Sequence, residues 1–409
     1  MSSNLLERRN DFPSLSRIVS GHPAAYFDGP GGTQVPRQVI QAITHYYENS
    51  NANAHGPFIT SRETDETVDR MREACAALLG ASSPATISFG ANMTSLAFAL
   101  ARALARAIQP GDEVLITDLD HEGNRGPWLT LQERGAVVHS VAITADGRLD
   151  MDDFAAKLSP KTKIVAVGCS SNSLGTVNDL AAIRKLSHSV GAWMIVDAVH
   201  YAPHFPLDVV ALDCDFLLCS AYKFYGPHVG ILYCRPGLLE QLTTDKLRAQ
   251  SDEAPYRIET GTPNFAALAG VTAAIEYIAS IGQGDSQREQ ILDGMKRIHD
   301  YEDGLARKLY DGLHAMDHVT VYGQPFGDAL RAPTISFTVN EMNSEDVAAY
   351  LGELGLFVWG GHFYAMRIYE VYQLENQGGL VRVGISLYNT EEEVERLLEA
   401  IRLLKGKNT

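Results

Sequence analysis

Cysteine is scarce in this 409-residue chain, and no two cysteines form a C-x-x-C pair. That spacing predicts neither a disulfide framework nor a zinc site, so we expect no metal centre. Several cysteines lie within or beside apolar, strand-like runs, which favours small buried thiols. The five cysteines are Cys75, Cys169, Cys214, Cys219 and Cys234. None follows Cys234, so the C-terminal part of the chain contains no thiol.

Long apolar runs and positive charge are also lacking. No run reaches the roughly 18–20 apolar residues that a membrane-spanning helix needs. The start, MSSNLLERRNDFPSLSRIVSG, has no continuous apolar core of the kind that signal peptides carry. The formal net charge of −16 at pH 7 argues against nucleic acid or an anionic membrane as a partner. We therefore expect a cytoplasmic protein.

The length and the pattern of apolar residues predict two domains. From about residue 85, short and nearly all-apolar runs alternate with amphipathic stretches. This alternation is typical of an α/β domain whose mostly parallel sheet is buried on both faces. The predicted strands are 86–89, 113–117, 137–143, 162–168, 193–197, 216–219 and 230–234, and helices between them include 93–107 and 180–190.

The pattern changes after about residue 280. A long helix with a polar face is predicted over 287–316, followed by strands at 334–339 and 380–386. A final helix is predicted over 390–404, with Asn389 or Thr390 as its cap and glutamates in its first turn. We expect residues 20–282 to form the large domain, and residues 1–19 with 283–409 to form a smaller α+β domain.

Three predicted strands end in polar residues. The run WMIVD ends in Asp197, the run FLLCS leads through Ser220 to Lys223, and the run EVLIT leads to His121. Each residue alone has a common structural explanation: a helix cap, a solvated lysine or a structural histidine. Function in open α/β sheets gathers at the carboxyl ends of strands, so we interpret the three ends together.

This set of residue types fits the chemistry of pyridoxal 5′-phosphate (PLP). The PLP aldehyde forms an imine with a lysine amine, and the pyridine nitrogen needs a carboxylate partner. The phosphate needs hydroxyls and backbone amides at a helix start, which the segment FGANMT (89–94) would supply. A nicotinamide site and a nucleotide P-loop are not favoured, because G-x-G-x-x-G does not follow the first strand and G-x-x-x-x-G-K-[ST] is absent.

Further ordered motifs extend over nearly the whole chain. They are YFDGPGGTQVP (26–36), DHEGNRGPW (120–128), SNSLGT (171–176), VDAVH (196–200), SAYKFYGPHVG (220–230), ETGTPN (259–264) and VRVGISLYNT (381–390). With these motifs the sequence resembles the PLP-dependent class V aminotransferase superfamily, and within it the cysteine desulfurase-like branch. The resemblance implies fold type I, with a mostly parallel, mixed seven-stranded sheet in the large domain.

The resemblance also implies roles for individual residues. Lys223 would be the Schiff-base lysine, Asp197 the partner of the pyridine nitrogen, and His121 the residue stacked on the ring. The other implied cofactor contacts are Asn172 and His200 at the ring hydroxyl, and Ser220, Tyr222 and the amides near Ala91 and Asn92 at the phosphate.

Substrate binding and assembly follow from the same resemblance. Arg382 would bind the α-carboxylate of an amino-acid substrate through a bidentate pair. The loop containing Gly31 would line the pocket. Thr262 would reach the phosphate of the neighbouring subunit, which implies a homodimer with shared active sites.

One segment departs from the family. Desulfurases carry a nucleophilic cysteine on a mobile loop shortly before the carboxylate-binding arginine, whereas the matching segment VWGGHFYAM (358–366) has Tyr364 in that place. A phenol cannot become a persulfide, so this loop cannot perform persulfide-forming desulfuration. Tyr364 is either an aromatic that packs at the pocket mouth or an acid/base phenol, and its reference pKa of about 10 makes it a better donor than base. His362 is either a second acid or an exposed loop residue.

We predict a lyase that cleaves a C–S, or similar Cβ–X, bond by β-elimination after Lys223 removes the Cα proton. Transamination, racemisation or epimerisation, and decarboxylation are alternatives, because several of these reactions share a carbanion at Cα. Release of sulfur or selenium from cysteine or selenocysteine by another route is a third possibility. The fourth is a non-catalytic PLP-fold protein that acts as a binding partner.

Overall fold

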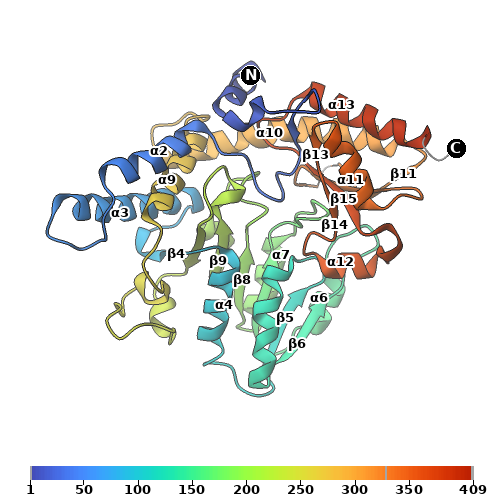
Figure 1. Ribbon diagram of the computed structural model, residues 1–409. Coiled ribbons are helices and arrows are strands. Elements are labelled where there is room, and N and C mark those ends of the chain that lie inside the picture. The colour runs from blue at the N-terminus through green and yellow to red at the C-terminus, as the bar shows by residue number, and fades with distance from the viewer. Residues whose placement is uncertain (1, 328, 407–409) are drawn as a thin grey trace.

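The computed structural model describes residues 2–327 and 329–406, which form two main sheets and two short two-stranded sheets with surrounding helices (Figure 1). The larger sheet has seven strands in the order β4-β10-β9-β8-β7-β5-β6. They are β4 (Ile87–Gly90), β5 (Glu113–Thr117), β6 (Val137–Val141), β7 (Thr162–Gly168), β8 (Trp193–Asp197), β9 (Phe216–Ser220) and β10 (Gly230–Cys234). Strands β5 to β9 pair in parallel, and β10 runs antiparallel to both β4 and β9. The predicted α/β fold with a mixed, mostly parallel sheet is confirmed.

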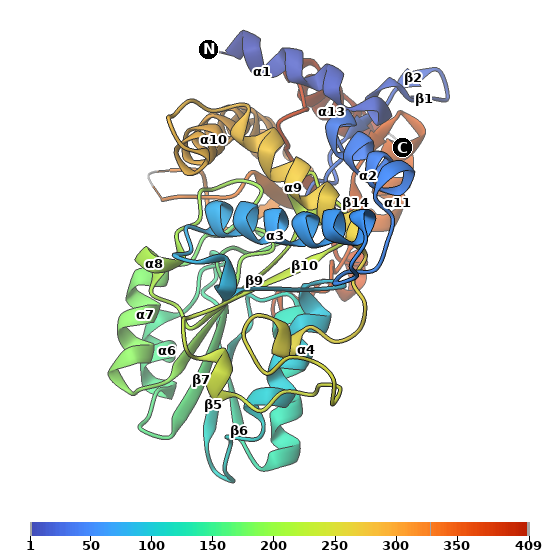
Figure 2. The same ribbon diagram turned by 90° about the vertical axis from the view of Figure 1, so that its left-hand side faces the viewer.

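Both faces of this sheet are buried, because consecutive residues of each central strand point to opposite faces and are apolar. In β7, Val165 and Val167 join a core cluster on one face, whereas Ile164 and Ala166 join a second cluster on the other. The first cluster contains residues of α3 (Ile59–Leu79), α7 (Leu180–Ser189) and α9 (Phe265–Ala279), and the second contains residues of α4 (Met93–Leu104). Figure 2 shows α7 and α4 on opposite sides of the sheet.

The smaller sheet has four strands in the order β11-β12-β15-β14. They are β11 (Val319–Tyr322), β12 (Thr334–Val339), β14 (Trp359–Gly361) and β15 (Leu380–Gly384). A third core cluster joins this sheet to α10 (Gln287–His314), α11 (Ser344–Glu353) and α13 (Glu391–Arg402). The N-terminal segment joins the same region, because β3 (Ala25–Tyr26) pairs in parallel with β13 (Leu356–Phe357). The domain boundary at residue 283 stays a prediction.

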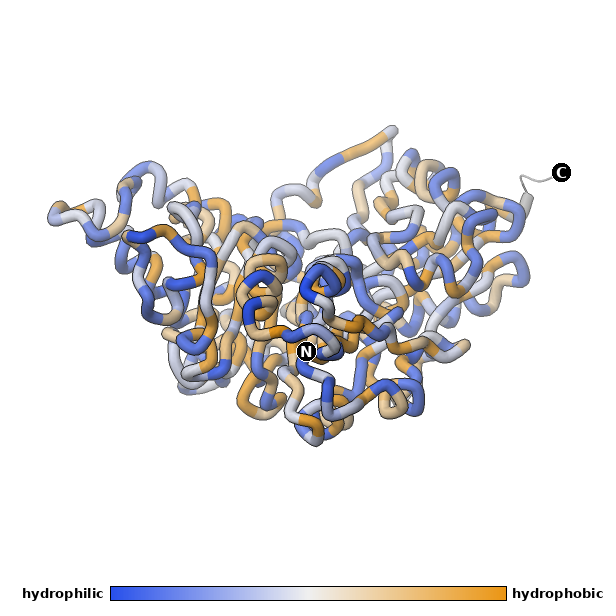
Figure 3. Tube along the Cα trace, turned by 90° about the horizontal axis from the view of Figure 1, so that it is seen from below, coloured by the Kyte–Doolittle hydropathy of each residue, from blue (hydrophilic) through white to orange (hydrophobic). Residues whose placement is uncertain are grey.

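The remaining helices are shorter or lie nearer the surface. They are α1 (Ser2–Arg8), α2 (Arg37–Asn49), α5 (Gly126–Leu129), α6 (Met151–Lys157), α8 (Val209–Leu212) and α12 (Met366–Val371). Hydrophobic and hydrophilic residues are interspersed along the whole trace (Figure 3). Within the described residues, no helix combines the length and the apolar character that crossing a bilayer requires.

Several predicted boundaries are wrong by a few residues, and local hydrogen bonds explain most of them. Strand β4 begins at Ile87 because Thr86 closes a 3-10 turn. Strand β15 stops at Gly384, after which the Ser386 amide bonds to Asn389 and the chain turns. The final helix is capped by Thr390, whose side chain forms a capping box with Glu393.

Candidate active site

The parallel arrangement of β5, β8 and β9 brings their carboxyl ends to one edge of the large sheet. Asp197 is the last residue of β8, Lys223 closes the 3-10 turn after β9, and His121 follows β5. Lys223 is near enough to act on the other two groups. Its charge adds to the lowering of the His121 pKa by burial, and it opposes the rise of the Asp197 pKa that burial causes. The structure therefore brings together the three residues that sequence reasoning singled out first.

Lys223 is buried, with 8% of its surface exposed. Its amine donates hydrogen bonds to the carbonyl oxygens of Pro30 and, at 3.1 Å, Gly31. Burial, reinforced by the charge of Arg382, lowers the pKa of Lys223 to about 7. An amine with such a pKa is about half unprotonated at pH 7, far more than an ordinary lysine, which suits it to covalent bonding and to proton transfer.

Asp197 is the partly buried last residue of β8, and its carboxylate accepts a hydrogen bond of 2.8 Å from the Val199 amide. Burial raises the pKa of Asp197 to about 6, against the opposing effects of that hydrogen bond and of the Lys223 charge. A cationic ring nitrogen beside this carboxylate would favour its charged form. The geometry and burial fit a partner for a pyridine nitrogen.

Asp120 is a second buried acid near Asp197 that sequence reasoning missed. It accepts hydrogen bonds from the Gly168 amide at 2.7 Å and the Thr117 hydroxyl at 2.8 Å. Burial raises the pKa of Asp120 to about 7, and the neighbouring Asp197 charge adds to the shift. The available signal was its position in the run DLDH, directly before His121.

His121 is held as a neutral imidazole. Its Nδ1 accepts a hydrogen bond of 2.8 Å from the Gly123 amide, which leaves the ring proton on Nε2. Burial first, and the charge of Lys223 second, lower the pKa of His121 to about 4. A neutral planar ring in this position can stack on a cationic aromatic ring.

The start of α4 offers an anion-binding end of the site. Asn92 caps this helix in a reciprocal pair with Ser95, and the Met93 amide donates to the Ser220 hydroxyl at 2.9 Å. Amides at a helix start and the positive end of its dipole favour a phosphate. The structure therefore places Ser220 beside the Ala91–Asn92 turn, as that role requires. Tyr222 lies next to Lys223, with its ring 4.9 Å from the amine.

Asn172 and His200 are the residues predicted to contact the ring hydroxyl of PLP. Each has one buried polar atom without a hydrogen-bond partner among the described residues. Asn172 donates through Nδ2 to the Phe363 carbonyl at 3.0 Å, whereas its Oδ1 has no partner. His200 contacts the Thr334 hydroxyl through Nε2 at 3.0 Å, whereas its Nδ1 has none. Buried polar atoms are usually paired, so these two atoms fit a further polar group such as the ring hydroxyl of PLP.

Arg382 occupies the opposite side of the site, on β15, with 4% of its surface exposed. It contacts the Asn172 carbonyl at 3.2 Å and the Asp28 carboxylate at 3.4 Å, and its guanidinium lies 4.4 Å above the Phe363 ring. Its Nε has no partner in the part of the chain that the structure describes. These contacts leave Arg382 able to form a bidentate pair with a substrate carboxylate.

Sequence reasoning also missed Asp28, which stands between the two cationic groups of the site. Burial raises the pKa of Asp28, although the charges of Arg382 and Lys223 oppose this effect. A Cβ at Gly31 would meet the Asp28 carboxylate at 2.4 Å, so a larger residue there would displace this side chain. The signal for Asp28 was its place in the glycine-rich motif YFDGPGG.

Tyr364 lies at the mouth of the site with 65% of its surface exposed. Its ring centre is 5.5 Å from that of His121, and its amide donates to His362 Nδ1 at 3.1 Å. The structure therefore brings Tyr364 and His362 to the same edge as His121. All five cysteines are buried, and burial raises the pKa of every one of them.

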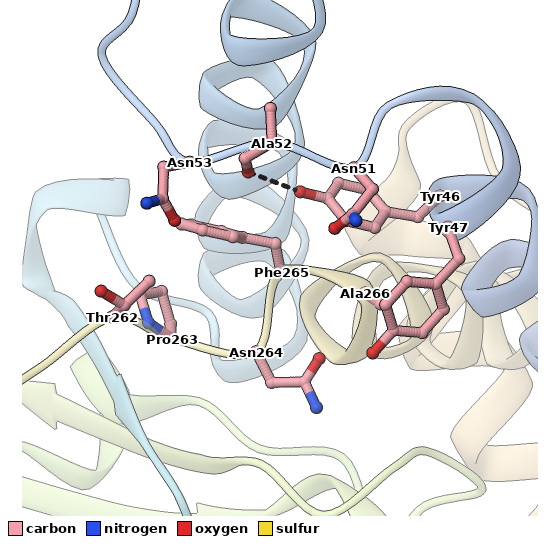
Figure 4. Close-up of a pocket in the computed structure, with 10 residues that line it drawn as sticks. All are labelled: Tyr46, Tyr47, Asn51, Ala52, Asn53, Thr262, Pro263, Asn264, Phe265 and Ala266. Carbon is pink, nitrogen blue, oxygen red and sulfur yellow. Dashed lines mark hydrogen bonds between the residues drawn. The ribbon is translucent and has the colours of Figure 1, made fainter.

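Thr262 is not brought to Lys223 within the described residues of one chain. It lines a separate cavity of about 480 Å³ between the end of α2 and the start of α9 (Figure 4). Tyr47, Asn53 and Phe265 also line this cavity. Among the described residues, no group of three or more His, Cys, Asp or Glu side chains is arranged to hold a metal ion.

Comparisons with known proteins agree with this arrangement. The Aminotransferase class-V family matches residues 25–397. A cysteine desulfurase of Klebsiella pneumoniae subsp. pneumoniae is 33% identical over 99% of this chain and 100% of its own length. A probable cysteine desulfurase of Synechocystis sp. is 32% identical over 96% of this chain and 94% of its own. The apo structure of a cysteine desulfurase from Thermococcus onnurineus NA1 matches with a TM-score of 0.87, at 28% identity and 98% coverage of both chains.

The family match covers most of the chain, and the residues at the sheet edge fit the chemical groups of PLP. Family membership implies this cofactor, whose aldehyde, ring nitrogen and phosphate would face Lys223, Asp197 and the start of α4. The chain therefore belongs to the class-V aminotransferase family, as a PLP-dependent enzyme similar to the cysteine desulfurases.

Proposed function

We propose that this enzyme removes the β-substituent of a cysteine-like amino acid by β-elimination, without forming a persulfide on a cysteine of its own. PLP supplies the electron-accepting ring that stabilises negative charge at Cα. The chain supplies a carboxylate-binding arginine, a base and an acid. The reaction class of its relatives, which are named cysteine desulfurases, supports a C–S bond as the one that breaks.

Each residue of the site has its own role in the proposed reaction. Arg382 holds the substrate carboxylate and so orients the Cα–H bond towards Lys223. Lys223, freed as an amine with a lowered pKa, removes the Cα proton. Asp197 keeps the ring nitrogen protonated, and His121 covers the ring face. Tyr364 donates a proton to the departing sulfur, and Lys223 is the group placed to return a proton where one is needed.

One observation carries the choice of elimination over persulfide transfer. Sulfur abstraction needs an accessible thiolate near the substrate. All five cysteines of this chain are buried with raised pKa values. By its resemblance to the desulfurases, the chain carries Tyr364 in the place of their cysteine. Elimination needs no such thiol, because the sulfur leaves with the electrons of the broken C–S bond.

Product analysis tests this proposal. The purified holoenzyme is incubated with cysteine and a reductant, and pyruvate, ammonia, sulfide and alanine are measured. Elimination predicts pyruvate and ammonia in equal amounts with sulfide, and S-substituted cysteines should give pyruvate and the matching thiol. Alanine with sulfide would contradict the proposal, and a requirement for an amino-group acceptor would indicate transamination instead.

We propose in addition that the active enzyme is a homodimer in which Thr262 completes the phosphate site of the neighbouring subunit. The position of Thr262 in a surface cavity away from Lys223 supports this, as does the exposed Tyr47 that lines the same cavity. Mixing the inactive variants Lys223→Ala and Thr262→Ala tests it. When equal amounts of the two variants exchange subunits at random, half of the dimers contain one subunit of each kind, and each of these dimers has one intact site. About one quarter of wild-type turnover should therefore return. No recovery after subunit exchange would refute shared sites.

A further inference from the structure

The loop that carries Tyr364 has a backbone that needs external support. Phe363 and Tyr364 have φ angles of 54° and 57°, so two consecutive non-glycine residues adopt the left-handed conformation. This conformation is strained for residues with a Cβ, and it persists only where surrounding contacts fix it. The loop, residues 361–366, connects β14 with α12.

Contacts with the active site hold the first half of this loop. The Phe363 carbonyl accepts a hydrogen bond of 3.0 Å from Asn172, and the Phe363 ring lies buried against Arg382. The Tyr364 carbonyl accepts a hydrogen bond of 2.7 Å from the Glu122 amide. Since Glu122 follows His121, the loop is bonded directly to the turn that presents the ring-stacking histidine.

An ion pair holds the second half. Arg367, in the first turn of α12, binds Asp118 with both arms of its guanidinium, through Nε at 2.9 Å and Nη2 at 3.2 Å. Asp118 directly follows β5 and is itself fixed by Arg125 and Ser140. The pair therefore fastens α12 to the same turn, three residues before His121.

The electrostatics favour a permanently charged pair. Burial alone would raise the pKa of Asp118, but the hydrogen bonds from Arg367 and Ser140 and the charges of two arginines hold it below its ordinary value. Arg367 stays protonated at any physiological pH. A planar, bidentate pair also sets the direction of α12, which a single lysine contact would not do.

We propose that Arg367 is a positioning residue, which through Asp118 clamps the 361–366 loop against the His121 turn and so fixes Tyr364 at the substrate. This role deepens the proposed function, because it matters for turnover only if Tyr364 transfers a proton. The clamp itself, however, is a property of the loop that can be measured without turnover.

The primary test is hydrogen exchange on the holoenzyme, with Arg367→Ala as the perturbation and Arg297→Ala as the matched control. Arg297 is also partly exposed and pairs with Asp293 at 2.8 Å, but on α10, whereas Arg367 pairs with Glu370 of its own helix as well as with Asp118. In Arg367→Ala the Glu122 amide should exchange about tenfold faster or more, because the carbonyl that it bonds is released. The control should leave this amide unchanged. Unaltered protection of Glu122 in Arg367→Ala would overturn the clamp.

Kinetics supply a second readout. Arg367→Ala should lower kcat by about tenfold, a part of the full contribution of a general acid, while KM changes less. Arg367→Lys should restore a part of kcat. In a Tyr364→Phe background, Arg367→Ala should cause no further loss, because it acts through Tyr364. Full additivity of the two losses would show that Arg367 acts elsewhere and would overturn the positioning role.

The two proposals can fail separately. If Tyr364→Phe has wild-type kcat, the proton-donor role in the proposed function is wrong, and the exchange rate of the Glu122 amide alone decides whether the clamp exists. If the Glu122 amide is unaffected while Tyr364→Phe is slow, the proton donor stands and the clamp does not.

Discussion

Replacement of Arg382 gives a quantitative test of how the substrate is held. The guanidinium is buried, its contacts to Asn172 and Asp28 are long at 3.2 and 3.4 Å, and its Nε has no partner within residues 2–327 and 329–406. It is thus prepared for a carboxylate that brings shorter, charge-assisted hydrogen bonds. In Arg382→Ala that carboxylate would enter a buried site without its guanidinium partner.

The size of the effect follows from the burial of the pair. Removing one member of a buried, hydrogen-bonded charge pair costs about 2–5 kcal/mol. This corresponds to a loss of about 30- to 5,000-fold in kcat/KM for cysteine. Arg382→Lys keeps the charge but cannot form the bidentate pair, so we expect a smaller loss in kcat/KM of about tenfold or somewhat more.

The assay compares cysteine with its methyl ester, which lacks the negative charge. Steady-state kcat/KM for each substrate is measured with wild-type enzyme and with Arg382→Ala, and absorbance of the bound cofactor serves as the control for loading. The variant should lose far more activity with cysteine than with the ester, because any general damage affects both substrates equally. Equal losses would refute the assignment of Arg382 to the carboxylate.

Three further predictions test other parts of the site. Tyr364→Phe should slow product formation by about 10²-fold if the phenol protonates the leaving sulfur, and an unchanged rate would return Tyr364 to a packing role. Asp197→Asn should keep the fold, weaken PLP retention in dialysis and reduce turnover to near background; wild-type turnover would exclude it as the ring-nitrogen partner. Protonation of His121 should cost the folded apo protein stability as the pH falls from about 6.5 towards 4, because His121 binds its proton less readily when folded, with an upper contribution of roughly 2–4 kcal/mol, whereas Asp120 and Asp197, whose pKa values are raised, contribute in the opposite direction. Urea denaturation of both proteins isolates the His121 contribution: the free energy of unfolding of His121→Gln relative to wild type should rise as the pH falls over this range, and an identical pH dependence would contradict the lowered pKa.

The large sheet could be predicted from the sequence because most of its strands are marked by a short, continuous apolar segment. The central positions of β5, β7 and β8 are continuously apolar, so their burial on two faces follows from composition. The ends of elements were less accurate. Val137–Val141 ends two residues earlier than predicted, since the chain turns back and the Asp150 amide bonds to Ala142. Hydrogen bonds of this kind between distant residues leave no periodic signal.

The same contrast applies to the active site. Lys223, Asp197 and His121 could be found because each lies at or shortly after the end of a recognisable strand. Asp28 could not be placed beside Arg382, because these residues are joined only by the pairing of the N-terminal segment with the smaller sheet. Arg367 carries no motif at all, and its contact with Asp118 depends on where α12 packs in three dimensions.

The account depends most on Lys223 being the amine that holds the cofactor. Borohydride reduction of the purified holoenzyme, followed by proteolysis and mass spectrometry, locates that bond directly. The account predicts a phosphopyridoxyl adduct on the peptide that contains Lys223, and its loss in Lys223→Ala. An adduct on another lysine, or no adduct at all, would contradict it.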